Sequence, residues 1–118
     1  MRRKRGVVCV CNDTTQTIED AFERACLNIL GPDFEPECTS GIEGNHSPES
    51  GHYYGRAEDF GFFGYSRATK KRVTIPAAKR GLLVSETQGL LGEEIHPAKY
   101  LVILESHHVH IQRQKESF

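Results

Sequence analysis

The sequence predicts a small α+β domain, a mostly antiparallel sheet with about two helices. Three observations lead to this class. The chain has 118 residues, the usual size of one domain. Its first third contains an amphipathic helical pattern, and the rest contains short apolar runs separated by Gly, Pro and polar residues. We see no repeat and no linker, so we expect one domain over residues 1–118, with residues 1–5 and 113–118 flexible.

The N-terminal part predicts a strand followed by a helix. Residues 6–11 form a short apolar run that favours a strand. Helix-capping residue types follow at 13–15. From 17 to 30 the apolar residues recur at the spacing of one helix face, and Gly31 with the next proline ends the pattern. The apolar positions are Ile18, Ala21, Phe22, Ala25, Cys26, Ile29 and Leu30.

The middle of the chain predicts two strands around a loop. A proline-containing link at 33–36 precedes a strand at 37–42. Residues 43–56 are rich in glycine and polar groups and indicate a structured loop. Residues 57–62 are strand-like, whereas 64–75 are basic and lack a clear period.

The C-terminal part predicts a helix and a hairpin. Pro76 suits the start of a helix at 77–91, although two glycines weaken that pattern. The apolar run at 100–104 indicates a buried strand. A tight turn around 105–107 would lead to a last strand at 108–112.

Charge and hydropathy exclude some classes of protein. Lys and Arg number 15 against 16 Asp and Glu, a net charge of −1, which does not favour a strongly basic nucleic-acid binder. No apolar run approaches the ~18 residues of a membrane span. The apolar run after the basic start is shorter than the ~7–15 residues of a signal peptide. We therefore expect synthesis in the cytoplasm.

Two further features keep alternatives open. Residues 60–80 hold six bases and no acid, either a solvated surface or a patch for an anionic partner. The four cysteines lack zinc-ribbon spacing, so reduced and mostly buried thiols are expected, with a cysteine metal site as the alternative.

The histidines are the residues that most clearly indicate a metal site. Five of the six fall in two clusters, one at 46–52 and one at 107–110, with carboxylates nearby. Imidazole with carboxylate is a ligand set that suits catalytic zinc. His108 and His110 alternate by two, so on a strand they share one face. That face could meet His52 and Asp59 if the chain bends at Gly55, although ordinary polar loop histidines remain the alternative.

Such a cluster would support hydrolysis. Three protein ligands leave a fourth zinc position for water, whose pKa falls from ~15.7 towards ~7. Glu105, at the mouth of the proposed hairpin, could then act as general base.

The same segments resemble a known family. Residues 50–59, SGHYYGRAED, resemble the S-x-H-x-x-G-x-A-x-D signature of the zinc D-alanyl-D-alanine carboxypeptidases and phage endolysins. Residues 105–110, ESHHVH, resemble their second signature, an acid followed by a metal-binding histidine. Residues 45–57 also resemble the zinc site of the Hedgehog amino-terminal signalling domain, which shares the fold. Residues 39–44 resemble the strand and turn that precede the site in short phage and environmental members of the peptidase family.

The resemblance implies a fold and a role for each matched residue. The fold would be Hedgehog/DD-peptidase-like. Zinc would be bound by His52, Asp59 and His110, with Glu105 as catalytic base and His108 steadying the oxyanion. Two more residues would lie near the metal or the substrate, namely His46 and Arg56. The implied protein is a metallopeptidase that hydrolyses peptidoglycan stem peptides, with release to the cell wall open if it is a phage lytic protein. Separately, we expect a monomer that does not bind nucleic acid.

The chain departs from that family at two points. Glu58 stands where the family usually has an apolar residue, either as a surface group on an edge strand or as a rival ligand. No arginine lies between Arg24 and Arg56 to hold a terminal carboxylate, which leaves endopeptidase activity open beside carboxypeptidase activity. Two other functions remain as alternatives: a non-catalytic zinc-binding interaction module, and a structural or nucleic-acid-associated domain that uses the basic stretch.

Overall fold

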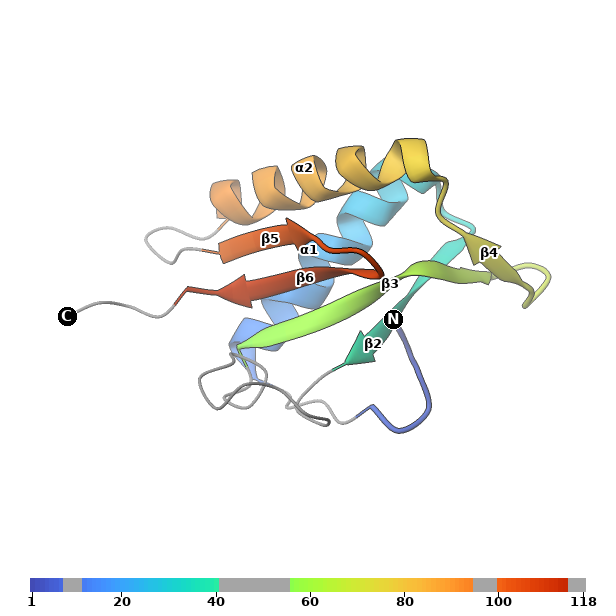
Figure 1. Ribbon diagram of the computed structural model, residues 1–118, viewed down its shortest axis with the longest axis horizontal. Helices are drawn as coiled ribbons and strands as arrows, with labels where there is room; N and C mark the ends of the chain where they lie inside the picture. The colour runs from blue at the N-terminus through green and yellow to red at the C-terminus, as the bar shows by residue number, and fades with distance from the viewer. Residues whose placement is uncertain (8–11, 41–55, 95–99, 115–118) are drawn as a thin grey trace.

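The chain folds into a six-stranded sheet covered on one side by two helices (Figure 1). The computed structural model describes residues 1–7, 12–40, 56–94 and 100–114. Its elements are β1 (Arg2–Arg3), α1 (Asp13–Leu30), β2 (Phe34–Ser40), β3 (Ala57–Ser66), β4 (Arg72–Thr74), α2 (Ala77–Glu94), β5 (Tyr100–Leu104) and β6 (His108–Arg113). The strand order is β1-β2-β3-β6-β5, and β4 pairs with β3. Only β1 and β2 pair in parallel, so the α+β class with a mostly antiparallel sheet is confirmed for the described residues.

Helix α1 begins four residues before the predicted position. Asn12 is the N-cap: its side chain accepts a hydrogen bond from the Thr15 N–H at 2.8 Å, and Thr15 Oγ1 accepts from the Asn12 N–H at 3.2 Å. This reciprocal pair satisfies two backbone donors at the start of the helix. The helix ends at Gly31, whose φ of 91° lies in the region that favours glycine.

The hydrophobic core lies between the helices and one face of the sheet. Phe22 of α1 and Phe60 of β3 stack with their ring centroids 4.3 Å apart, and both are fully buried. Val109 and Ile111 of β6 and Leu83 of α2 belong to the same cluster. Because side chains alternate along a strand, the neighbours of these residues point to the opposite face of the sheet.

The β2–β4 region differs from the prediction. Phe34 and Pro36, assigned to a link by sequence, belong to β2, where Pro36 pairs with Gly64 beside a shift in register. An irregular position tolerates a residue that lacks an N–H donor. Strand β3 continues to Ser66, and β4 follows in the stretch where no period was visible.

The C-terminal half follows the prediction closely. Helix α2 covers 77–94, three residues longer than expected, and β5 and β6 form the expected hairpin. The expected strand at 6–11 lies mostly outside the described residues, because 8–11 are not described, and most of the expected loop at 43–56 lies outside them as well. No helix in the described part of the chain is long and apolar enough to cross a membrane.

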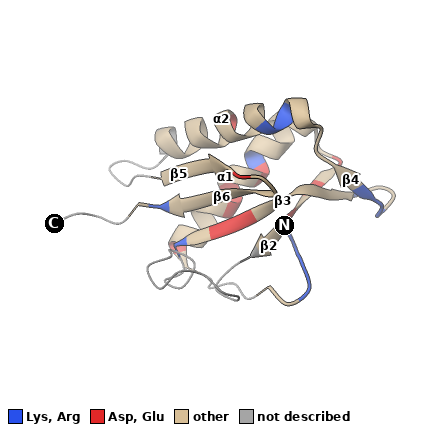
Figure 2. Ribbon diagram, in the orientation of Figure 1, with Lys and Arg blue, Asp and Glu red and all other residues tan. Residues whose placement is uncertain are grey.

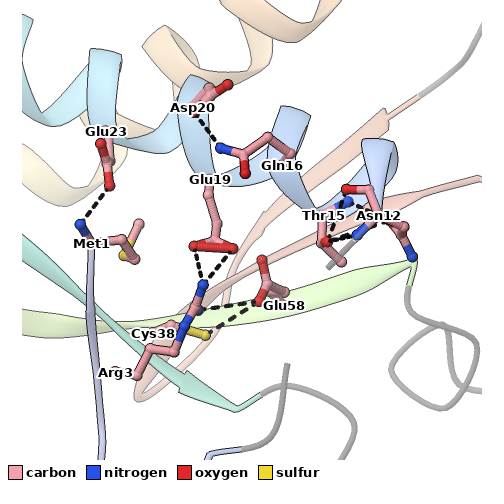
Figure 3. A network of polar contacts seen from close by, with 10 residues as sticks. All are labelled: Met1, Arg3, Asn12, Thr15, Gln16, Glu19, Asp20, Glu23, Cys38 and Glu58. Atoms are coloured by element: carbon pink, nitrogen blue, oxygen red, sulfur yellow. Dashed lines mark hydrogen bonds and ion pairs between the residues drawn. The ribbon is translucent and has the colours of Figure 1, made fainter. Parts of the chain in front are cut away.

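The N-terminal segment, expected to be flexible, is tied to the domain by ion pairs (Figure 3). The Arg3 guanidinium contacts both carboxylate oxygens of Glu19 at 2.8 and 3.0 Å and lies 3.8 Å from Glu58. The Met1 amine lies 2.8 Å from Glu23. These contacts place β1 beside β2 and against α1.

Candidate functional site

Two predicted metal ligands, Asp59 and His110, face each other on neighbouring strands. Asp59 of β3 is the register partner of His110 of β6. The Asp59 Oδ1 to His110 Nδ1 distance is 2.7 Å. Asp59 is 6% exposed and the His110 side chain 12%, so water screens this pair weakly. Both side chains lie on the face of the sheet opposite the core, since the next residues, Phe60 and Val109, are core residues.

His108 and Glu105 extend the cluster along the same face. His108 pairs with Gly61, two residues from Asp59, which confirms that the two β6 histidines share a face. Its Nε2 lies 3.5 Å from Asp59 Oδ1 and 3.0 Å from Glu105 Oε2. The Glu105 N–H donates to the His108 carbonyl at 2.9 Å, which closes the two-residue turn between β5 and β6. This turn holds the Glu105 carboxylate, 44% exposed, beside the His108 ring.

One member of the site was missed at the sequence level. Gln112 Oε1 lies 2.8 Å from His110 Nε2, and the Gln112 amide donates to Gln114 at 3.4 Å. The signal was present in the sequence, because His108, His110 and Gln112 alternate by two on one strand. An amide is not among the side chains that commonly bind zinc, so a metal-ligand pattern does not include Gln112.

The site favours the protonated form of His110. Burial acts to lower its pKa, but the hydrogen bonds that the ring donates to Asp59 and Gln112, with the negative charges of Asp59 and Glu105, outweigh burial and raise the pKa above the ordinary value. Each ring nitrogen of His110 faces an oxygen acceptor, which matches the two N–H donors of an imidazolium. A metal ion at either nitrogen would replace one of these hydrogen bonds.

The donor set of the cluster fits zinc, although the described residues do not complete a site. Atoms bound ~2.0–2.1 Å from a tetrahedral zinc ion lie roughly 3.3 Å apart. The 3.5 Å between His108 and Asp59 is of this order, whereas the 2.7 Å between His110 and Asp59 is a hydrogen bond and would have to lengthen by roughly 0.6 Å. Within the described residues no three His, Cys, Asp or Glu side chains are grouped as a metal site. The third predicted ligand, His52, lies outside the described residues.

Glu58 is neither a surface group on an edge strand nor a rival metal ligand, the two roles that the sequence suggested. Strand β3 lies between β2 and β6 and is not an edge, and Glu58 is 1% exposed, so it is not a surface group. Its side chain points to the helix side, where it contacts Arg3 and lies 3.6 Å from the Cys38 thiol (Figure 3). It therefore faces away from Asp59 and His110 and is not a rival ligand.

The other predicted residues are placed in part. His46 and the bend at Gly55 lie outside the described residues. Arg56 directly precedes β3, and its carbonyl accepts a hydrogen bond from the Arg113 N–H at 2.8 Å. Cys26 and Cys38 are buried thiols outside any disulfide, as expected, and burial raises the pKa of the Cys26 thiol, with a contribution from Glu23.

Comparisons with known proteins found no match to this chain among family models, curated proteins or solved structures.

Proposed function

We propose that the chain is a zinc-dependent metallopeptidase that hydrolyses peptide bonds in bacterial cell-wall peptides, with a Hedgehog/DD-peptidase-like fold. The observation that carries the proposal is the approach of Asp59, His108, His110 and Glu105 on one face of the sheet. These residues come from two strands and a turn that the sequence separates by up to 51 positions. Buried imidazole beside carboxylate is the composition of a hydrolytic metal site.

The proposed roles follow from the positions of the side chains. Asp59 and His110, the most buried of the four, would hold the ion together with His52. A zinc ion held there supplies Lewis acidity and lowers the pKa of bound water to about 7. Glu105 is more exposed, which suits a group that exchanges protons with substrate and solvent.

His108 stands between the ligands and the base. Its Nε2 lies 3.5 Å from Asp59 Oδ1 and 3.0 Å from Glu105 Oε2, and a ring N–H is a donor that can stabilise a negative oxygen. We assign it to the oxyanion that forms on the attacked carbonyl. Gln112 would orient His110 through its second ring nitrogen, as partners of metal-bound histidines commonly do.

Metal content is the first test. We expect about one zinc ion per purified chain, measured by mass spectrometry, and its loss in Asp59→Ala, His110→Ala and His52→Ala. His107→Ala is the matched control, because His107 lies in the same hairpin but is exposed. Zinc that stays bound in Asp59→Ala and His110→Ala would contradict the ligand assignment.

Turnover is the second test. Peptidoglycan is digested and the released amines are measured for the wild type, Glu105→Gln and the control Glu86→Gln, whose carboxylate lies on α2. We expect Glu105→Gln to lose about 10²–10⁴-fold in rate, as expected for a lost general base, while keeping zinc. Bound zinc without turnover in the wild type would favour a non-catalytic zinc-binding interaction module instead.

A further inference from the structure

A row of side chains continues along β3 beyond the candidate metal site. Asp59, Gly61, Phe63 and Tyr65 alternate by two, and the residues between them, Phe60 and Phe62, belong to the core. A Cβ at Gly61 would come within 3.7 Å of the Phe63 ring, which places that ring on the same face as the site. Since a strand rises ~3.3 Å per residue, the backbone positions of Phe63 and Tyr65 lie roughly 13 and 20 Å along β3 from that of Asp59.

An arginine guanidinium stacks on each of the two rings, Phe63 and Tyr65. The Arg72 guanidinium of β4 lies 3.4 Å from the centroid of Phe63, and the Arg2 guanidinium of β1 lies 3.7 Å from the centroid of Tyr65. A guanidinium that stacks by its face keeps its N–H donors at its edge, where they can bind a carboxylate. The stacking also fixes the side chain before a ligand arrives, which lowers the entropic cost of binding.

Positive charge gathers at the β4 end of this row, whereas Glu35 of β2 is the register partner of Tyr65 and pairs with Arg67. Lys70 and Lys71 lie in the exposed turn before β4, and no described acidic side chain forms an ion pair with Arg72. Arg2 lies 3.7 Å from the buried Glu37, which offsets part of its charge. Figure 2 shows Lys and Arg at the β3–β4 hairpin and along the N-terminal segment, whereas the acidic residues of β3 lie near its start.

The hairpin that carries Arg72 is fixed at its base. The Asp33 carboxylate accepts hydrogen bonds from the Ser66 hydroxyl at 2.6 Å and from the Ala68 N–H at 2.9 Å. The Arg67 N–H donates to the Asp33 carbonyl at 2.8 Å. These bonds join the turn after β3 to the link between α1 and β2, so Arg72 and Phe63 are presented on a rigid support.

We propose that this row binds an acidic, extended peptide, with carboxylates of the peptide on Arg72 and Arg2. The proposal rests on the proposed function, since it makes the bound peptide a continuation of the substrate that reaches the metal site. Alternate residues of an extended peptide lie roughly 6.6 Å apart, which matches the spacing of Phe63 and Tyr65 along β3. The positive charges of Arg72 and Arg2 and continuity with the candidate site favour an acidic peptide.

Binding is measured by fluorescence anisotropy with a labelled ten-residue probe of alanine and serine that carries two glutamates separated by one residue. The matched probe has glutamine at both positions. We expect tighter binding of the glutamate probe, weakened by salt, and a loss of roughly threefold to fivefold in Arg72→Gln and in Arg2→Gln. Arg24→Gln, an exposed arginine on α1, is the control and should bind as the wild type does.

Three results would overturn the proposal. They are equal binding of the two probes, unchanged binding in both arginine variants, and Arg72-dependent binding of a single-stranded oligonucleotide tighter than that of the glutamate probe. Zinc content and peptidoglycan turnover are measured on the same preparations. A protein without turnover that still needs Arg72 and Arg2 for the glutamate probe would refute the proposed peptidase and leave the peptide-binding row standing.

Discussion

Arg3→Met should destabilise the domain through two buried carboxylates. The substitution keeps an unbranched apolar side chain but removes the guanidinium that contacts Glu19 at 2.8 and 3.0 Å and lies 3.8 Å from Glu58. Removing one partner of a fully buried ion pair costs about 3–5 kcal/mol. The Arg3 side chain is 37% exposed, so water screens part of the interaction and we expect a loss of about 2 kcal/mol.

The assay is thermal and urea unfolding followed by circular dichroism. The unfolding entropy near the midpoint is roughly 2.1 cal/mol/K per residue, or about 0.25 kcal/mol/K for 118 residues, so 2 kcal/mol corresponds to a fall of about 8 °C in Tm. Arg24→Met, at an exposed position of α1, is the control and should stay within about 0.5 kcal/mol. The cost of Arg3→Met should fall by at least about 1 kcal/mol in a Glu19→Gln background. A loss below about 0.5 kcal/mol, or no coupling to Glu19, would refute the reasoning.

Three further predictions concern the site and the core. In the metal-free protein, NMR titration should place the pKa of His110 above its ordinary ~6.5. The contribution of His110 to stability is then complete below about pH 6.5 and is lost as the pH rises through the folded-state pKa. A measured pKa below about 6.5 would contradict this. Phe60→Ala should cost about 3–5 kcal/mol in urea unfolding, because it empties the core opposite Phe22, and a loss under 1 kcal/mol would mean that the stack is not formed. Gly64→Ala should cost about 1–3 kcal/mol in the same assay, because its Cβ would overlap the Glu35 carbonyl oxygen; wild-type stability would show that β2 and β3 can separate there.

The elements with a strong periodic signal could be predicted from sequence. The apolar stripe of α1 and the run of β5 are each long enough to determine type and approximate position. The start of α1 was placed too late, because Asn12 caps it through a side-chain contact with Thr15 that apolar spacing does not reveal. Strand β4 was missed because it has only three residues and all are exposed, so no alternation of apolar and polar residues marks it, although a short turn alone separates it from β3.

The candidate site could be predicted in part. The alternation of His108 and His110 indicates a shared face, and the register with β3 adds Asp59 to it. The sequence does not show the register of β3 against β6, and this register decides that Asp59 and not Glu58 faces the histidines. A slip of one residue would exchange the two acids, since the side-chain period of a strand is two.

The adjacent acids of β3 show how the fold separates two tasks. Glu58 lies under the sheet against Arg3 and Cys38, in a network with α1 and β1 that includes no described residue of the metal site. Asp59 lies on the other face, within reach of both β6 histidines. Two neighbouring carboxylates on the same side would repel each other and compete for the same cations. On opposite faces of the sheet each acid has its own counter-charges, Arg3 for Glu58 and the β6 histidines for Asp59. One face of β3 is therefore tied to the N-terminal segment, and the other face carries the candidate site.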